Sequence, residues 1–395
     1  MKILMIASYL PYPLHSGGHI RLYNLIKNLS KENEITLICE KRDFQTQQDT
    51  EEVEKICKKV VTVPRKKQWS IKNILKTGFS TNPFLITGHT SEEMKTAIRD
   101  EMVRESFDLI HVETFYVSQN LPKVTIPVVL VEHNVEYLVY KRYVSLLNPL
   151  VKPFLLIDIA KIKQKEEAAW GKATKLVAVS NVEKKIMKRE NIAVIPNGVD
   201  TQEFRFRDFQ AIPKEKKILF IGDFKWLQNR DSLEFILKEI WPKVIEKFSQ
   251  LNKDFDLKLW VVGRNLPDSF KEYNLPNVIF DTNNKDETWD IFRKSFILLA
   301  PFRAAGGTSY KVLEAMSSGV GIVTTNLGIE GLEAKNGVHV LAAQTADELA
   351  NCVVDLALDS SLYRKLTINS RKFVEQNYDW KIISDKLNKI YMSVL

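Results

Sequence analysis

Short apolar runs alternate with longer amphipathic segments along most of the chain. The short runs are rich in β-branched residues and end at turn residues, which is typical of strands, while the longer segments have the periodicity of helices. The runs are ILMIAS, EITLIC, DLIHVE, VVLVEH and KLVAVS in the first half and KILFIGD, LKLWVVG, NVIFD and FILLAP in the second. This alternation predicts repeated βαβ units.

The predicted strands are apolar at nearly every position, not at every second one. Strands of this kind are buried on both faces, as in parallel sheets covered by helices. The chain has 395 residues, more than the roughly 250 to 300 at which a single hydrophobic core stops growing. We therefore predict an α/β protein with two doubly wound, Rossmann-like domains.

A polar and charged stretch, residues 200–217, separates the two series of strands and contains Pro213. Such a composition is typical of a linker. We therefore place an N-terminal domain at residues 1–199 and a C-terminal domain at residues 218–377. The helical pattern of residues 378–395 follows the second domain, and whether it packs back on the first domain is left open.

The composition is that of an ordinary globular protein, with 45% hydrophobic and 27% charged residues. The longest apolar stretch, residues 146–160, is interrupted by Pro149, Lys152 and Pro153, so it falls short of the roughly 18 residues that a membrane span needs. The first residues have the pattern of a strand and a loop, not that of a signal peptide. We expect a cytoplasmic location.

Residue types that bind metals are scattered along the chain. Cys39, Cys57 and Cys352 form no CxxC pair, and no two histidines have a metal-ligand spacing. A D-x-D triplet at residues 254–256 precedes a predicted strand, and it would therefore lie away from the edge where open α/β sheets bind ligands. We expect neither a metal ion nor a cofactor.

One loop after a predicted strand has glycines suited to the close approach of a ligand. Gly17 and Gly18 precede an apolar-periodic helix, so backbone N–H groups at a helix N-terminus would be accessible to an anion. An ordinary turn is the alternative interpretation.

A second loop, residues 300–319, joins a strand to a helix that we expect to begin near Thr308, a good N-cap residue. Its candidate ligand-binding residues are Arg303, Gly306, Gly307, Thr308, Lys311 and Glu314. Lys311 and Glu314 share one helix face because they are three residues apart. Backbone amides and cations suit a bound anion, and a carboxylate suits the vicinal hydroxyls of a ribose. Together these groups predict a site for a nucleoside diphosphate. The alternative is a capped helix with a surface Lys–Glu pair.

Several segments, in a fixed order, resemble the family-4 glycosyltransferases, which are retaining enzymes of the GT-B fold. They are the SGG loop with RLYNLIKNLS, then DLIHVE, VEHNVE, KLVAVSNVE, VIPNGVD, LWVVGRN, and LEAMSSGVGIVTT followed by GIEGL. The resemblance covers nearly the whole chain. It implies that the sugar nucleotide binds between the domains, held mainly by the C-terminal one, and that the acceptor docks on the N-terminal one.

The resemblance also implies roles for single residues. Glu314 matches the second glutamate of the family's E-x7-E motif, which holds the donor ribose, whereas Gly306 replaces the first. The sequence is similar to a branch of the family with a glycine-rich motif followed by a lysine. Asp223 stands where an arginine is usual, and Gln228 or Asn229 where a lysine is usual. The candidate replacements for these two cations in donor binding are Lys225, Arg264, Arg303 and Lys311.

His133 follows the strand VVLVE and is the candidate catalytic residue. The resemblance implies that it approaches the donor sugar near the reacting carbon, although a histidine at a strand end is otherwise more often structural. His111 and Glu113 end the preceding strand, and we expect them to line the acceptor side.

The resemblance implies transfer of a sugar from a nucleoside-diphosphate sugar to a hydroxyl of a cell-surface glycan or glycolipid, with retention and without a metal. One alternative is a non-catalytic nucleotide-sugar-binding or scaffolding subunit, because Gly306 replaces a sugar-contacting glutamate. Another is a GT-B nucleotide-sugar epimerase, which would need carboxylates around the reacting carbon. A dehydrogenase is disfavoured because the GxGxxG fingerprint is missing.

Much of the net charge of +8 lies in residues 55–76, which contain eight Lys and Arg and no acid. The second half of this stretch mixes apolar residues with lysines, as amphipathic membrane-surface helices do. We expect it to contact an anionic membrane, on the inner face of the plasma membrane. A solvated loop followed by a core-facing helix is the alternative. Because the basic cluster is local, we do not expect nucleic acid as a partner.

Overall fold

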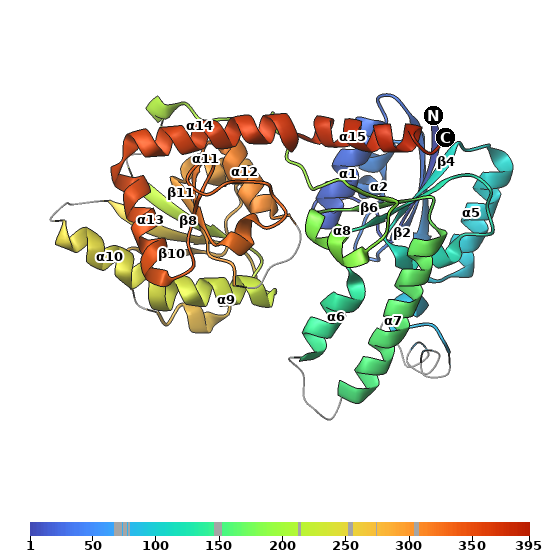
Figure 1. Cartoon of the computed structure of the whole chain (residues 1–395), viewed down its shortest axis with the longest axis horizontal. Helices are drawn as coiled ribbons and strands as arrows, with labels where there is room; N and C mark the ends of the chain where they lie inside the picture. Colours follow the sequence, from blue (N-terminus) through green and yellow to red (C-terminus); the bar gives the residue numbers. More distant parts are fainter. Residues whose placement is uncertain are drawn as a thin grey trace. The chain divides into compact units, whose positions relative to one another are not determined.

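The computed structural model describes residues 1–66, 73, 77, 80–145, 152–211, 215–251, 256–273, 275–303 and 308–395. They form two compact units, Met1–Pro196 with Ile383–Leu395 (the N-terminal unit) and Asn197–Ile382 (the C-terminal unit). Each unit has its own parallel sheet with helices packed on it (Figure 1). The predicted α/β class with two Rossmann-like domains is confirmed.

The sheet of the N-terminal unit has the strand order β3-β2-β1-β4-β5-β6-β7, with every neighbouring pair parallel. Its strands are β1 (Lys2–Ala7), β2 (Glu34–Lys41), β3 (Lys59–Pro64), β4 (Leu109–Glu113), β5 (Val128–Glu132), β6 (Lys175–Ala178) and β7 (Ile192–Val194). Strands β2 and β3 lie on one side of β1, and β4 to β7 lie on the other. The order therefore changes direction at β1, the place where open α/β sheets bind ligands.

The helices of the N-terminal unit follow these strands. They are α1 (Gly17–Leu29), α2 (Gln47–Glu54), α4 (Phe84–His89), α5 (Glu92–Arg104), α6 (Glu136–Ser145), α7 (Lys152–Lys172) and α8 (Asn181–Met187), with a 3-10 turn at Phe115–Asn120. Helix α1 starts one turn earlier than the sequence predicts, because Ser16 is its N-cap and Gly17 and Gly18 form its first turn. Helices α6 and α7 run side by side and extend away from the sheet (Figure 1).

The C-terminal helix α15 spans Trp380–Met392, and its residues from Ile383 onward belong to the N-terminal unit. The side chain of Tyr391 is buried there, with none of its surface exposed. Asn388 contacts Asn33, which donates from Nδ2 to Asn388 Oδ1 over 3.1 Å. The last part of the chain thus contributes to the core of the N-terminal unit.

The sheet of the C-terminal unit has the order β10-β9-β8-β11-β12-β13, again with parallel neighbours. Its strands are β8 (Lys216–Ile221), β9 (Leu257–Val262), β10 (Val278–Asp281), β11 (Ile297–Ala300), β12 (Gly321–Thr324) and β13 (Leu341–Ala342). Its helices are α9 (Leu227–Phe235), α10 (Trp241–Gln250), α11 (Thr288–Lys294), α12 (Tyr310–Ser318), α13 (Ala346–Leu358) and α14 (Ser360–Asn377), with a π-helical turn at Ile236–Ile240 between α9 and α10. The described residues from Asn197 to Ala211, most of the expected linker among them, belong to this unit.

The stretch 55–76 contributes an edge strand, β3, and its residues 67–72 and 74–76 lie outside the described residues. Every cation in its described part pairs with a carboxylate. The pairs are Lys55–Glu52, Lys58–Glu34, Lys58–Glu105, Lys59–Glu101, Arg65–Glu40 and Lys66–Glu93. No helix in the part of the chain that the structure describes is long and apolar enough to cross a membrane.

Candidate functional site

Lys311 lies on the first turn of α12 and reaches the carboxyl end of β8. Its Nζ donates to the carbonyl oxygen of Ile221 over 2.5 Å and to Asn229 Oδ1 over 3.2 Å. It also lies over the rings of Phe220 and Phe302, 5.3 Å from each ring centroid. An ammonium has three N–H donors, so one remains for a ligand.

Glu314 lies one turn further along α12 and is half-buried. The described residues supply no hydrogen bond to its carboxylate. Burial and the nearby Glu203 raise the pKa of Glu314 to about 7, against the effect of Lys311. Burial likewise lowers the pKa of Lys311 to about 8, against the effect of Glu314. Both groups therefore titrate close to neutral pH.

The N-terminus of α12 lies one residue later than the sequence predicts. Its N-cap is Ser309, not the expected Thr308, and the Ser309 side chain makes no capping hydrogen bond. Thr308 is buried, and its carbonyl oxygen accepts from Asn197 Nδ2 over 3.3 Å. Backbone N–H groups at a helix N-terminus favour an anion. Gly306 and Gly307 lie outside the described residues, so the roles expected for them stay predictions.

Backbone hydrogen bonds join the loops after β8 and β9 at the same edge of the sheet. The Gly222 N–H donates to the carbonyl of Val262 over 3.1 Å, and the Phe224 N–H donates to that of Arg264 over 2.9 Å. A Cβ on Gly263, whose φ is +150°, would lie 1.8 Å from the carbonyl oxygen of Gly222. Only glycine allows this approach, which holds the two loops in register.

The other candidate cations have separate surroundings. Lys225 and Arg264 are exposed on the loops after β8 and β9, and Arg264 Nη2 lies 4.0 Å from Asp223 Oδ2. Arg303 forms two hydrogen bonds to Asp231 on α9, of 2.6 and 3.1 Å. A carboxylate thus already engages Arg303.

Asn229 is a site residue whose role the sequence did not reveal. Its Nδ2 donates to the carbonyl of Asp223 over 2.8 Å, and its Oδ1 accepts from Lys311. The side chain therefore joins the loop after β8 to α12. The signal in the sequence was that Asn229 or Gln228 stands near the place of the usual lysine of the family.

In the N-terminal unit, a chain of hydrogen bonds leads to His133, directly after β5. His133 Nε2 lies 2.5 Å from Glu113 Oε1, and Glu113 Oε2 lies 2.6 Å from His111 Nε2. His111 Nδ1 in turn lies 2.6 Å from the hydroxyl of Tyr391 on α15. Four side chains from β4, the end of β5 and the C-terminal helix thus form one network.

The burial of this network corrects one expectation. His111 and Glu113 have no exposed surface, so they do not line an acceptor surface, whereas the side chain of His133 is 19% exposed. Burial alone would raise the pKa of Glu113, but His133 and His111 hold it well below its usual range. The carboxylate is therefore ionised, and a buried ionised carboxylate requires such partners.

His133 faces the N-terminus of α1. A Cβ on Gly18 would lie 2.9 Å from Tyr9 Oη and 3.7 Å from His133 Cε1. Burial raises the pKa of the neighbouring Glu136 to about 7, against the effect of His133. His133 and Gly18 of α1 therefore lie together near the point where the strand order of the sheet changes direction.

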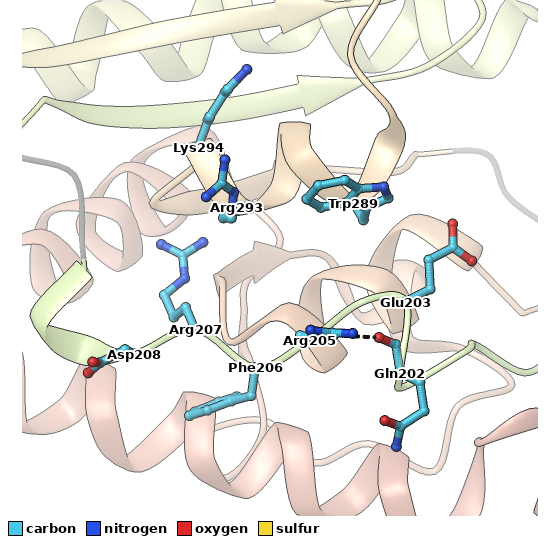
Figure 2. Close-up of a pocket in the computed structure, with 9 residues that line it drawn as sticks. All are labelled: Gln202, Glu203, Arg205, Phe206, Arg207, Asp208, Trp289, Arg293 and Lys294. Carbon is cyan, nitrogen blue, oxygen red and sulfur yellow. Dashed lines mark hydrogen bonds between the residues drawn. The ribbon is translucent and has the colours of Figure 1, made fainter.

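A cavity of about 780 Å³ in the C-terminal unit is lined by residues 202–208, apart from Phe204, and by α11 (Figure 2). The Arg207 side chain extends toward α11, which carries Arg293. However, Arg207 donates to the carbonyl of Phe292 over 2.8 Å, and its N–H donates to that of Ser318 over 3.2 Å. Arg293 pairs with Asp290 over 2.7 Å. Carbonyls on α11 and α12 and a carboxylate thus engage these cations, and Arg207 Nη1 is buried without a hydrogen-bond partner among the described residues.

The architecture of two Rossmann-like units defines the class of the protein as GT-B. Sucrose-phosphate synthase from Thermosynechococcus elongatus is 15% identical, with a TM-score of 0.70 over all of this chain and 99% of that one. WaaG, a glycosyltransferase involved in lipopolysaccharide biosynthesis, is 12% identical, with a TM-score of 0.66 over 99% of each chain. Anabaena Alr3699/HepE in complex with UDP is 15% identical, with a TM-score of 0.65 over 100% of each chain.

Models of protein families match most of the chain and identify its family. Residues 15–203 match Glycosyltransferase Family 4, and residues 215–359 match Glycosyl transferases group 1. The "Uncharacterized 44.6 kDa protein in cps region" of Klebsiella pneumoniae is 21% identical over 98% of this chain and 99% of its own. The chain belongs to the family-4 glycosyltransferases, and it is a transferase of sugars from nucleotide donors.

Proposed function

We propose that the protein is a retaining, metal-independent hexosyltransferase that moves a sugar from a nucleoside-diphosphate sugar to a hydroxyl of a cell-surface glycan or glycolipid. The C-terminal unit binds the donor, and His133 of the N-terminal unit acts in catalysis. Transition-state charge on the leaving diphosphate is stabilised by cations and helix-terminal amides, which need no metal.

The observation that carries the proposal is the corner between β11 and α12. Lys311 offers an N–H at the carboxyl end of β8, and Glu314 offers a carboxylate one turn away on the same helix. The N-terminus of α12 lies directly before them. A diphosphate suits the cation and the amides, and vicinal ribose hydroxyls suit the carboxylate.

Two further expectations from the sequence belong to the proposal. Gly18 lies beside His133, and Gly17 precedes it in the first turn of α1, where their backbone would approach the donor. Lys225 and Arg264 are exposed at the edge of the sheet where ligands bind, which supports a role for them with the phosphates. For Arg303 the pairing with Asp231 favours a structural role instead.

Two alternatives remain distinct from this proposal. A non-catalytic subunit would bind the donor without releasing nucleoside diphosphate when acceptor is added. An epimerase would convert the donor sugar without any acceptor, and Glu136 beside His133 is a carboxyl group near the candidate catalytic position.

The experiment begins with thermal stabilisation by UDP- and GDP-sugars, since a ligand that binds only the folded state raises the melting temperature. UDP-glucose comes first, because a structure of Alr3699/HepE holds that donor. The stabilising donor is then incubated with glycan and glycolipid acceptors, with and without EDTA. Release of nucleoside diphosphate and a product of retained anomeric configuration support the proposal. Donor binding without release, or an inverted product, contradicts it.

The cytoplasmic location and the membrane contact of residues 55–76 stay predictions. Vesicle sedimentation with Arg65, Lys66 and Lys67 changed to Glu tests the contact, which should weaken if the stretch binds anionic lipid. The ion pairs of its described cations, such as Arg65 with Glu40, reduce the positive charge that it can offer.

A further inference from the structure

We propose that Glu113 is a positioning residue that keeps His133 protonated on Nε2 and so presents His133 Nδ1 as a hydrogen-bond acceptor to the substrate. This rests on the proposed function only for the contact between His133 and substrate. The protonation pattern itself is a property of the free protein.

Donors and acceptors in the network determine the pattern. An ionised carboxylate only accepts hydrogen bonds. Each oxygen of Glu113 lies within 2.6 Å of one histidine Nε2, so both of these nitrogens carry a hydrogen. Tyr391 keeps its hydroxyl hydrogen, because burial holds the pKa of that hydroxyl well above the ordinary value, so it donates to Nδ1 of the neutral form of His111. Every hydrogen bond in the network is therefore directed toward Glu113.

Nδ1 of His133 is left as a hydrogen-bond acceptor by this pattern. A neutral imidazole carries one N–H, and here it is on Nε2, so Nδ1 keeps its lone pair. None of the described residues makes a hydrogen bond to Nδ1. Its ring neighbour Cε1 is the atom that faces Gly18. His133 is thus set to accept from a hydroxyl group, whereas the other tautomer would offer that hydroxyl a donor.

Nitrogen-15 NMR of labelled histidines tests the proposal on the free protein, with His133→Asn used for assignment. The wild type should show His133 as the Nε2–H tautomer. In Glu113→Gln the amide both accepts and donates, so one of the two histidines must change tautomer. We expect a second His133 form and at least a tenfold loss of kcat at unchanged donor KM. Glu113→Asp, which keeps an acceptor-only group, should retain the Nε2–H tautomer.

Two results would overturn the role of Glu113. One is a wild-type His133 in the Nδ1–H form, which is decisive even if Glu113→Gln does not fold. The other is a folded Glu113→Gln variant with unchanged tautomer and turnover. If the tautomer is as stated but the wild type transfers no sugar, the proposed function fails while the positioning by Glu113 stands.

Discussion

Replacing Lys311 with Met isolates the contribution of one ammonium group to donor binding. The variant keeps an unbranched side chain between Phe220 and Phe302 but removes the charge and all three donors. Two donors serve Ile221 and Asn229, so the third is the one available to a phosphate oxygen. A hydrogen bond to a charged group contributes about 1.5 to 3 kcal/mol, so affinity for the nucleoside diphosphate should fall roughly 10- to 150-fold.

Isothermal calorimetry with the nucleoside diphosphate and with the free nucleoside separates the phosphate contact from everything else. Only the diphosphate should lose affinity, because the nucleoside has no phosphate. Lys294→Met, on α11, is the matched control, since it changes the charge of the C-terminal unit equally. A thermal melting curve measures how much stability the variant loses with the hydrogen bond to the Ile221 carbonyl on β8. Equal weakening of both ligands, or unchanged affinity in a folded Lys311→Met, would refute the assignment.

The remaining predictions address neighbouring features. Glu314→Ala should weaken nucleoside and nucleotide alike by at least about tenfold in calorimetry, because ribose hydroxyls lose a charged acceptor. The pKa of Glu314 is about 7 and that of Lys311 about 8. Nucleotide affinity should therefore fall below pH 7, where the carboxylate is protonated, and above pH 8, where the ammonium loses its charge. A flat affinity profile from pH 5 to 10 would argue against both assignments. His133→Ala should lower kcat at unchanged donor Kd in steady-state and calorimetric measurements. Gly263→Ala should reduce the free energy of unfolding in urea by more than about 1 kcal/mol, because its Cβ would meet the carbonyl of Gly222.

The sequence alone determined the fold class and nine of the strands. Parallel strands covered on both faces are continuous apolar runs, and such runs are visible without any partner. The edge strand β3, with only one fully buried residue, was hidden in a basic stretch. The short strands β7, β12 and β13 of two to four residues also escaped, since a few apolar residues do not distinguish a strand from a loop or a helix end.

The sequence also predicted which residues lie at the ligand-binding edge of each sheet. His133 follows β5 directly and Lys311 lies on the helix after β11, and the carboxyl ends of parallel strands share one edge. The exact helix starts were wrong by one residue at Ser309 and by one turn at Gly17, because capping depends on the backbone geometry before each helix.

Only the tertiary structure decided the partners of those residues. Asn229 meets Lys311 across 82 positions, and Tyr391 meets His111 across 280. No local pattern encodes such pairs, because a hydrogen bond forms wherever the folded backbone brings a donor to an acceptor. The buried Glu113 would be costly alone, and the fold supplies two histidines to satisfy it, one of which bonds a tyrosine of the C-terminal helix.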